Sequence, residues 1–559
     1  MPLFVLAAVL VAAGPQARAE KVRTPPTALA ESQDVAAMLD LESKISDSLQ
    51  VGHVVPVDFD SPDQLPGHVV RTPYWGDTQL WSGVYVGGEA MRYAVANKHL
   101  AELAAAAPGR SGANGGSRAA REAVAFWTQQ RDEAHGRVRV VLAAQHRDVT
   151  IAEDWVGQPY VPPRVNTQDP RGPHTVDYGG GVVHGERGLV TRGCTPKGLG
   201  PMGINPPSTD PANPVNDSSN HVYEITWTHG DGITYYCETS PSRDTYAGLF
   251  FGMLTAFDLV DDPALRSQVR DDVLAMAGYL VTHGWNHVRP NGAVGTNNDE
   301  DGFVSPLMAH VPLARLNVVN AARHVADLAG STEQAAKWDA LWAQELATQG
   351  LLVGANMQVD AAQPSSSYFK FNLNHLLGFN LLRTTSGAER ELIARGFAVM
   401  DKTTGDDQNA HFEALTFGLT GDAERRDAAV THLEQWLSYR SSISGGAAVR
   451  NSARCGVDLT CVPEDRAELL VDQAPGGAVD WWPATSTSLR ADAPLPVAQR
   501  PPTDFLWQAP PGRLDGRQDA SSREPGIDFL TPYWTIRYFT EVAPPVVAPF
   551  PEWAGPPSR

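Results

Sequence analysis

The sequence predicts an all-α protein whose helices close into an (α/α)6 toroid of about twelve helices. Apolar residues recur with a period of 3.6 along twelve segments, whereas strand-like runs are confined to residues 222–227 and 233–237. The helical segments also alternate in character, because segments that are apolar on all sides alternate with segments that are polar on one face. Inner helices alternating with outer helices through short turns are the pattern of such a toroid.

Two neighbouring segments illustrate the alternation. Residues 245–260 (TYAGLFFGMLTAFDLV) are apolar nearly all round, which predicts a helix buried on every side. The next segment carries Leu265, Val269 and Val273 on one face and Arg266 and Arg270 on the other, which predicts a surface helix. An irregular helical fold and an open solenoid remain alternatives to the toroid. The expected helices are 31–50, 77–107, 118–149, 244–261, 263–284, 305–330, 331–349, 368–383, 386–402, 408–420, 421–440 and 526–540.

The N-terminus has the features of an export signal. Residues Leu3 to Ala13 form an apolar run too short to span a bilayer, and Ala17-Arg18-Ala19 is a small-x-small cleavage site. The prediction is a signal peptide over residues 1–19 and a secreted or periplasmic protein. One feature of a signal peptide is missing, since no Lys or Arg lies between Met1 and the apolar run. A buried N-terminal helix is the alternative.

The remaining chain predicts one toroid domain over residues 20–541. Residues 155–242 and 441–525 are rich in Gly and Pro and are expected to form two long loop or short-strand insertions. The tail, residues 542–559, is rich in proline and is expected to pack as an extended arm. No other apolar stretch approaches 18 residues, so no membrane span is expected.

The four cysteines suit an exported protein. The simplest of three possible pairings joins Cys194 to Cys237 and Cys455 to Cys461. No C-x-x-C pair exists and no histidines cluster with the cysteines, so we expect no metal site. No cofactor is expected either.

Charge limits the partners. The chain has 44 Lys and Arg against 64 Asp and Glu, a formal charge of −20. Nucleic-acid binding needs a basic surface, so it is not expected.

Polar residues gather where the expected inner helices begin. In a toroid the inner helices all run in one direction, so their N-termini share one mouth. Ionisable groups occur at all six of these starts, together with Trp75 and Trp81. Helix capping explains Asp77, Asp406 and one of Asp299 or Asp301. Capping does not explain the other residues, which are Arg243, Lys370, His375, His411 and Glu413.

A ring of carboxylates, histidines, asparagines and aromatic side chains is typical of a site that holds a sugar. Aromatic faces stack on sugar rings, polar groups bind hydroxyls, and two carboxylates supply acid and base across the scissile bond. The expected partner is therefore an oligosaccharide or polysaccharide.

Four segments carry a resemblance. The pair WGDTQLWSGVY and SRDTYAGLFFG, with the C-terminal DFLWQAPPGRLDG and EPGIDFLTPYWTIRYF, resembles the six-hairpin glycosidases, including glucoamylase-like and unsaturated-glucuronyl-hydrolase-like enzymes. It also resembles secreted bacterial proteins without an assigned function. The resemblance covers most of the mature chain as architecture. It implies no particular catalytic pair.

The sequence thus predicts a secreted carbohydrate-active enzyme of the glycoside hydrolase type. Asp244 and Glu413 are the expected acid/base pair, with Glu524 and Asp77 in reserve. The expected substrate-binding residues are Arg243, Tyr246, His411, Asn374, His375, Lys370, Trp75 and Trp81.

Two other functions fit the same residues. A polysaccharide lyase or epimerase would abstract a proton with a tyrosine or histidine and neutralise a uronate with Arg243. Its candidate bases are Tyr246, Tyr368, His375 and His411. The other alternative is a non-catalytic glycan-binding or structural protein of the periplasm.

Overall fold

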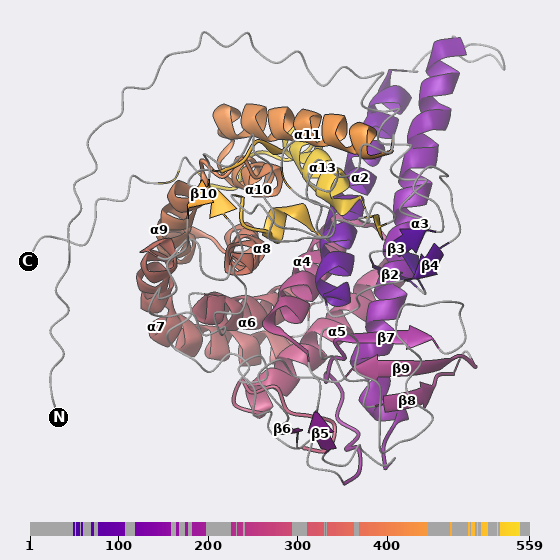
Figure 1. The fold of residues 1–559 in the computed structure, drawn as a ribbon, viewed down its shortest axis with the longest axis vertical. Helices are drawn as coiled ribbons and strands as arrows, with labels where there is room; N and C mark the ends of the chain where they lie inside the picture. The colour runs from indigo at the N-terminus through magenta and orange to yellow at the C-terminus, as the bar shows by residue number, and fades with distance from the viewer. Residues whose placement is uncertain are drawn as a thin grey trace, which may run out of the picture.

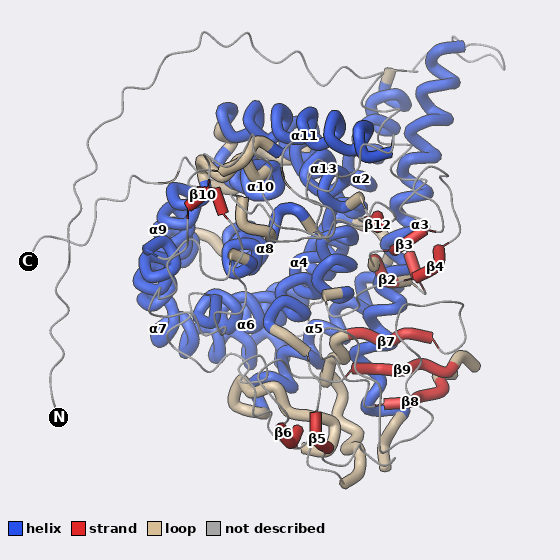
Figure 2. The backbone as a smooth tube through the Cα atoms, viewed as in Figure 1, coloured by secondary structure: helices blue, strands red, loops and turns tan. Residues whose placement is uncertain are grey.

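The computed structural model describes residues 77–106, 118–157, 181–196, 225–292, 310–362, 368–444, 505–511 and 526–547, apart from gaps of one or two residues. It also describes short segments elsewhere, among them 49–59, 69–71, 164–166, 174–176, 470–471, 490–491 and 522–523. Most of these residues are helical, and they contain eleven α-helices (Figure 1). The strands are short and lie at the margin of the helices (Figure 2). The prediction of an all-α protein is confirmed.

Six helices pack against one another and form the centre of the structure. The helix α10 is buried along its whole length, and α4 is buried without interruption from Thr245 to Phe257. These six are α2 (Thr78–Ala105), α4 (Arg243–Leu259), α6 (His310–Leu328), α8 (Phe369–Thr384), α10 (Ala410–Thr420) and α13 (Ile527–Glu541).

Each of the other five described helices follows one of these and packs against it. α3 packs on α2, α5 on α4, α7 on α6, α9 on α8 and α11 on α10. The five are α3 (Arg118–Asp154), α5 (Pro263–Thr282), α7 (Thr332–Ala362), α9 (Gly387–Thr404) and α11 (Ala423–Ser444).

The expected and observed helices agree closely for ten of the twelve segments. α7 is longer than expected, because it continues to Ala362. The first expected helix, 31–50, lies outside the described residues except at its end, where Leu49–Gln50 forms the strand β1. That end of the prediction is wrong, since β1 pairs with β2 (His53–Val54).

Side-chain contacts show that α4 and α8 run in the same direction, with α6 beside their C-terminal ends. Near their C-terminal ends, Asp258 of α4 accepts a hydrogen bond from His324 of α6 at 2.7 Å and another from Arg383 of α8. Further toward their N-termini, Phe251 of α4 packs on Phe379 of α8, with ring centroids 5.7 Å apart.

The helices α2 and α4 approach each other through glycines. A Cβ atom added to Gly83 would lie 1.9 Å from the carbonyl oxygen of Gly248, and one added to Gly252 would lie 2.5 Å from the carbonyl oxygen of Gly83. Gly248 in turn lies against Leu80. The order of the contacts makes the two helices parallel, and only glycine allows backbones this close.

The insertion that precedes α4 contains a three-stranded antiparallel sheet. Its order is β7 (Gly193–Pro196), β9 (Thr234–Glu238) and β8 (Ile225–Thr228). β8 and β9 form the hairpin expected around residues 229–232. Cys194 and Cys237 lie opposite each other on β7 and β9 and form a disulfide, as predicted. Cys455 and Cys461 lie outside the described residues.

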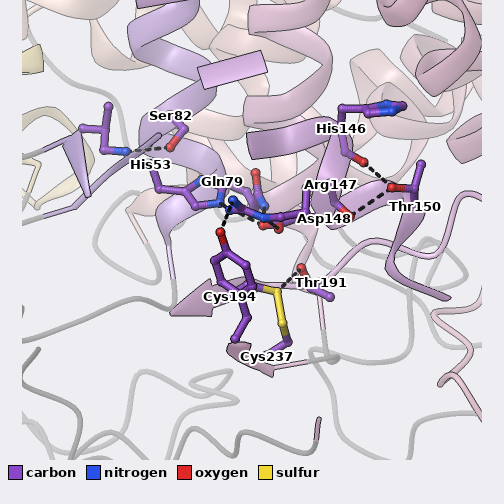
Figure 3. Close-up of polar contacts among 12 residues, drawn as sticks. His53, Gln79, Ser82, His146, Arg147, Asp148, Thr150, Thr191, Cys194 and Cys237 are labelled. Atoms are coloured by element: carbon purple, nitrogen blue, oxygen red, sulfur yellow. Dashed lines mark hydrogen bonds and ion pairs between the residues drawn. A yellow bond between two sulfur atoms is a disulfide. The ribbon is translucent and has the colours of Figure 1, made fainter. Parts of the chain in front are cut away.

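A buried polar network joins this sheet to the helices (Figure 3). Asp148 of α3 accepts hydrogen bonds from Gln79 of α2 at 2.6 Å and from Arg147 at 3.3 Å, and it lies 3.0 Å from His53. Arg147 donates to the Tyr235 hydroxyl of β9 at 3.1 Å, and its guanidinium lies over the Tyr235 ring. The network therefore fixes the disulfide-bonded sheet against the beginning of α2.

Removing this disulfide is expected to destabilise the protein. The bond closes a segment with a sequence separation of 43, for which the lost loop entropy corresponds to about 2–4 kcal/mol. A Cys194→Ser, Cys237→Ser double variant should lose that much in urea unfolding. Equal stability of the double variant and the parent under oxidising conditions would contradict the assignment.

The other described strands are short pairs. β12 (Ser522–Arg523) pairs with β3 (Val57–Phe59), which also pairs with β4 (Val69–Arg71). β5 (Arg164–Asn166) pairs with β6 (His174–Val176), and β10 (Leu470–Val471) pairs with β11 (Arg490–Ala491). All of these pairs are antiparallel.

The described part of the C-terminal tail packs across the far end of α10. The backbone N–H groups of Val546 and Val547 both donate to the Leu419 carbonyl oxygen, and Arg390 donates to the Val546 carbonyl oxygen at 2.8 Å. Among the described helices, none is both long and apolar enough to cross a membrane.

Candidate active site

The beginnings of α2, α10 and α13 meet around one turn of 3-10 helix, η3 (Leu506–Gln508). Asn409, the residue before α10, donates to the Trp507 carbonyl oxygen at 2.9 Å. Asp528 of α13 accepts from the Leu506 backbone N–H at 3.0 Å. Gln508 donates to Asp77, the residue before α2, at 3.4 Å. These contacts place residues 77, 409 and 528 in one neighbourhood, although they are far apart in sequence.

A proline inside α13 explains part of this arrangement. Pro532 lacks an N–H group, so it cannot make the helical bond to the Asp528 carbonyl oxygen four residues earlier. The Trp507 indole N–H donates to that carbonyl at 2.7 Å instead. The proline thus frees the acceptor that holds η3 in place.

The loop between α9 and α10 carries a half-buried carboxyl group, Asp407. Its side chain accepts a hydrogen bond from the Tyr368 hydroxyl at 2.7 Å, and its backbone carbonyl accepts from Arg500 at 2.5 Å. The next residue, Gln408, has a φ of 52°, a left-handed conformation that is uncommon outside glycine. Strained backbone of this kind clusters at functional sites.

Burial raises the pKa of Asp407 to about 6. The charges of Asp406 and Glu413 also raise this pKa, whereas the Tyr368 hydroxyl and Arg500 lower it. Arg500 is 4% exposed, and burial lowers its pKa to about 10. Asp407 is therefore a carboxyl group that stays protonated to an unusually high pH.

Glu413 is the second carboxylate of this cluster. It lies in the first turn of α10, is 4% exposed and lies 2.7 Å from the Nδ1 atom of His432 on α11. Its charge raises the pKa of both Asp407 and Arg500. One carboxyl group with a raised pKa and one carboxylate held by a histidine thus lie in the same electrostatic neighbourhood.

The expected residues Arg243, Asp244 and Tyr246 lie in the first turn of α4. Arg243 and Asp244 are the first two residues of α4, and Ser242 caps the helix in a capping box with Thr245. Tyr246 is buried, its ring centroid lies 5.2 Å from that of His287, and burial raises its pKa.

Five other expected residues are in the interior. His375 stacks on Phe412 with ring centroids 3.8 Å apart, and His411 approaches Phe505 at 5.7 Å. Burial lowers the pKa of both histidines to about 3, so both are neutral near pH 7. Trp81, Asn374, His375 and His411 have no exposed surface, and Lys370 is 7% exposed.

The capping explanation is wrong for two aspartates. Asp77 precedes α2 but makes no capping hydrogen bond with its side chain, and it lies 3.9 Å from Arg192. Asp406 does not cap α10, because Asn409 accepts from the Phe412 backbone N–H. Trp75, Glu524, Asp299 and Asp301 lie outside the described residues.

The catalytic residues predicted from the sequence do not include Asp407. The predicted site also does not include Arg500 or His432. The signal for Asp407 is its place in the run Asp406-Asp407-Gln408-Asn409 before a helix that is otherwise mostly apolar. No neighbouring sequence pattern indicates a role for Arg500, which lies 93 residues after Asp407 in the chain.

No protein-family model, curated protein or solved structure matches this chain. Among the described residues, no group of three or more His, Cys, Asp or Glu side chains could hold a metal ion. The function is therefore inferred from the cluster of Asp407, Glu413, Tyr368 and Arg500.

Proposed function

We propose that the helices form an (α/α)6 toroid. Contacts link α2 to α4, α4 to α6, α6 to α8, α8 to α10, α10 to α13 and α13 back to α2, which is a closed circuit. The parallel directions of α2 and α4, and of α4 and α8, support the proposal. So does the packing of α3, α5, α7, α9 and α11 on the preceding helices of the circuit.

We further propose that the protein is a secreted glycoside hydrolase with Asp407 as general acid and Glu413 as the second carboxylate. The observation that carries the proposal is the pKa of Asp407, which burial raises to about 6 beside Glu413. Glycosidases need one carboxyl group that is protonated near the working pH and a second that is ionised. Export is supported by the Cys194–Cys237 disulfide.

In this mechanism Asp407 donates its proton to the oxygen of the leaving sugar. Glu413 either activates a water molecule or attacks the anomeric carbon. The hydrogen bond from Tyr368 holds the Asp407 carboxyl group in one orientation. Asp244, Asp77 and Glu524 are not assigned a catalytic role.

The lyase or epimerase alternative has less support. Its base would be a tyrosine or histidine, but burial raises the pKa of Tyr246 and Tyr368 and lowers the pKa of His375 and His411. Neither change favours proton abstraction near neutral pH.

The direct test incubates the purified protein with a panel of neutral and acidic glycans. New reducing ends without an absorbing unsaturated product are expected for a hydrolase. An unsaturated product would support the lyase. Binding without cleavage would support a glycan-binding protein.

The rate of hydrolysis should fall as the pH rises through the pKa of Asp407. Because the general acid must be protonated, kcat/KM should fall about tenfold per pH unit as the pH rises above about 6. A pH–rate profile on the best glycan measures this. A rate that stays constant from pH 5 to 8 would contradict Asp407 as the acid.

A further inference from the structure

Glu413 of α10 and His432 of α11 form a contact between a central helix and the helix that follows it. The turn at residues 421–422 reverses the chain, so α11 packs back along α10. The Nδ1 atom of His432 lies 2.7 Å from the Oε2 atom of Glu413, and the two side chains are 12% and 4% exposed. A contact this short between side chains this buried restricts how the carboxylate can lie.

The two oxygen atoms of Glu413 have different surroundings. An ionised carboxylate only accepts hydrogen bonds, so Nδ1 of His432 carries the hydrogen of the contact and donates to Oε2. Among the residues that the structure describes, none donates a hydrogen bond to Oε1. The protein therefore holds one oxygen and leaves the other to react.

The two carboxyl groups of the cluster are each oriented by one side chain. The Tyr368 hydroxyl donates to Asp407, and His432 donates to Glu413. Arg500 does not orient Glu413 in this way, because its described hydrogen bonds end on backbone carbonyl oxygens. Within the described part of the chain, His432 is thus the side chain that fixes the second carboxylate.

We propose that His432 is a positioning residue for the second carboxylate of the proposed hydrolase. Its hydrogen bond to Oε2 keeps the Glu413 carboxylate in one orientation, so that Oε1 can activate a water molecule or attack the anomeric carbon. Either step needs the reacting oxygen close to its productive position, which a supporting hydrogen bond provides. The inference rests on the proposed function and extends it to a residue that does not itself touch the sugar.

The test measures kcat and KM of the wild type, His432→Leu and His432→Asn on the glycan that the wild type cleaves best. Leucine has no hydrogen-bond donor, whereas the amide N–H of asparagine can replace the Nδ1–H group. His432→Leu is expected to lower kcat by about 10–100-fold with KM nearly unchanged, because a misplacement of about 1 Å has an effect of this size. His432→Asn should recover most of the lost rate.

His324→Leu is the matched control. His324 also lies 2.7 Å from a carboxylate, that of Asp258, and both side chains are 21% exposed. This pair is remote from the cluster, because Asp258 also accepts from Arg383 near the end of α8, whereas Tyr368 precedes the first residue of α8. His324→Leu should lose stability in urea unfolding and keep the kcat of the wild type.

Three kinetic results would overturn the positioning role and leave the hydrolase standing. The first is a wild-type kcat in His432→Leu. The second is an equal loss of kcat in His324→Leu, which would indicate general structural damage. The third is no recovery of rate in His432→Asn.

The contact itself is tested without a substrate by a double-mutant cycle of His432→Leu and Glu413→Met in urea unfolding. The two changes in unfolding free energy should not be additive, because both variants remove the same hydrogen bond. Additive changes would contradict the contact and the role built on it. Absence of hydrolysis by the wild type would remove the proposed function together with the catalytic role of His432, while a non-additive cycle would still confirm the contact.

Discussion

Replacing Asp407 with asparagine is expected to lower kcat for glycan hydrolysis by about 10²–10⁴-fold. The amide keeps the shape of the side chain and can still accept the hydrogen bond from Tyr368, but it cannot donate a proton to the leaving sugar. The fold should not suffer. Because burial raises the pKa of Asp407, the ionised carboxylate is unfavourable in the folded protein, and its removal should leave stability at pH 7 equal or higher.

Asp406 provides the matched control for this variant. It is the neighbouring carboxylate, is exposed and raises the pKa of Asp407 only through its charge. Asp406→Asn should therefore keep most of the activity and shift the pH–rate profile slightly toward lower pH. Steady-state kinetics of both variants and of Glu413→Gln, which should be as inactive as Asp407→Asn, decide the assignment. Wild-type turnover by Asp407→Asn would show that another group supplies the proton.

Replacing Gly83 with alanine is expected to destabilise the protein by about 3 kcal/mol or more. The new Cβ would lie 1.9 Å from the carbonyl oxygen and 2.2 Å from the carbonyl carbon of Gly248. Both are backbone atoms of a buried helix, so α2 and α4 would have to separate. Gly248→Ala should act similarly, because its Cβ would lie 2.4 Å from the Cα of Leu80.

Gly136 in α3 is the control for this pair. A Cβ added there has no neighbour within 4 Å, so Gly136→Ala should stabilise the protein by about 0.5–1 kcal/mol through the better helix propensity of alanine. Urea unfolding of the three variants compares them. If Gly83→Ala unfolded like Gly136→Ala, the close approach of α2 and α4 would be contradicted.

The sequence predicts the helices well because burial leaves a direct trace in it. α4 and α10 are mostly apolar, and the structure buries α10 along its whole length and α4 from Thr245 to Phe257. Their outer partners are polar on one face. The Gly83–Gly248 contact could not be predicted in this way, because a glycine in a helix does not indicate which backbone it packs against.

The candidate site was harder to predict for two physical reasons. Arg500 and Trp507 reach the cluster from an insertion without helical periodicity, so their contacts depend on tertiary folding. The sequence also places His375, His411, Asn374 and Trp81 near helix starts but says nothing about what covers them. In the structure these four side chains are fully buried. Glu413 remains in the proposal because its charge raises the pKa of Asp407.

The most direct test of the account is a titration of the Asp407 side-chain carboxyl carbon by ¹³C NMR, assigned with the Asp407→Asn variant. The expected midpoint is about pH 6, and it should fall in Glu413→Gln because one raising charge is gone. A midpoint near 4, the ordinary value for aspartate, would mean that Asp407 is ionised at neutral pH and cannot be the proton donor.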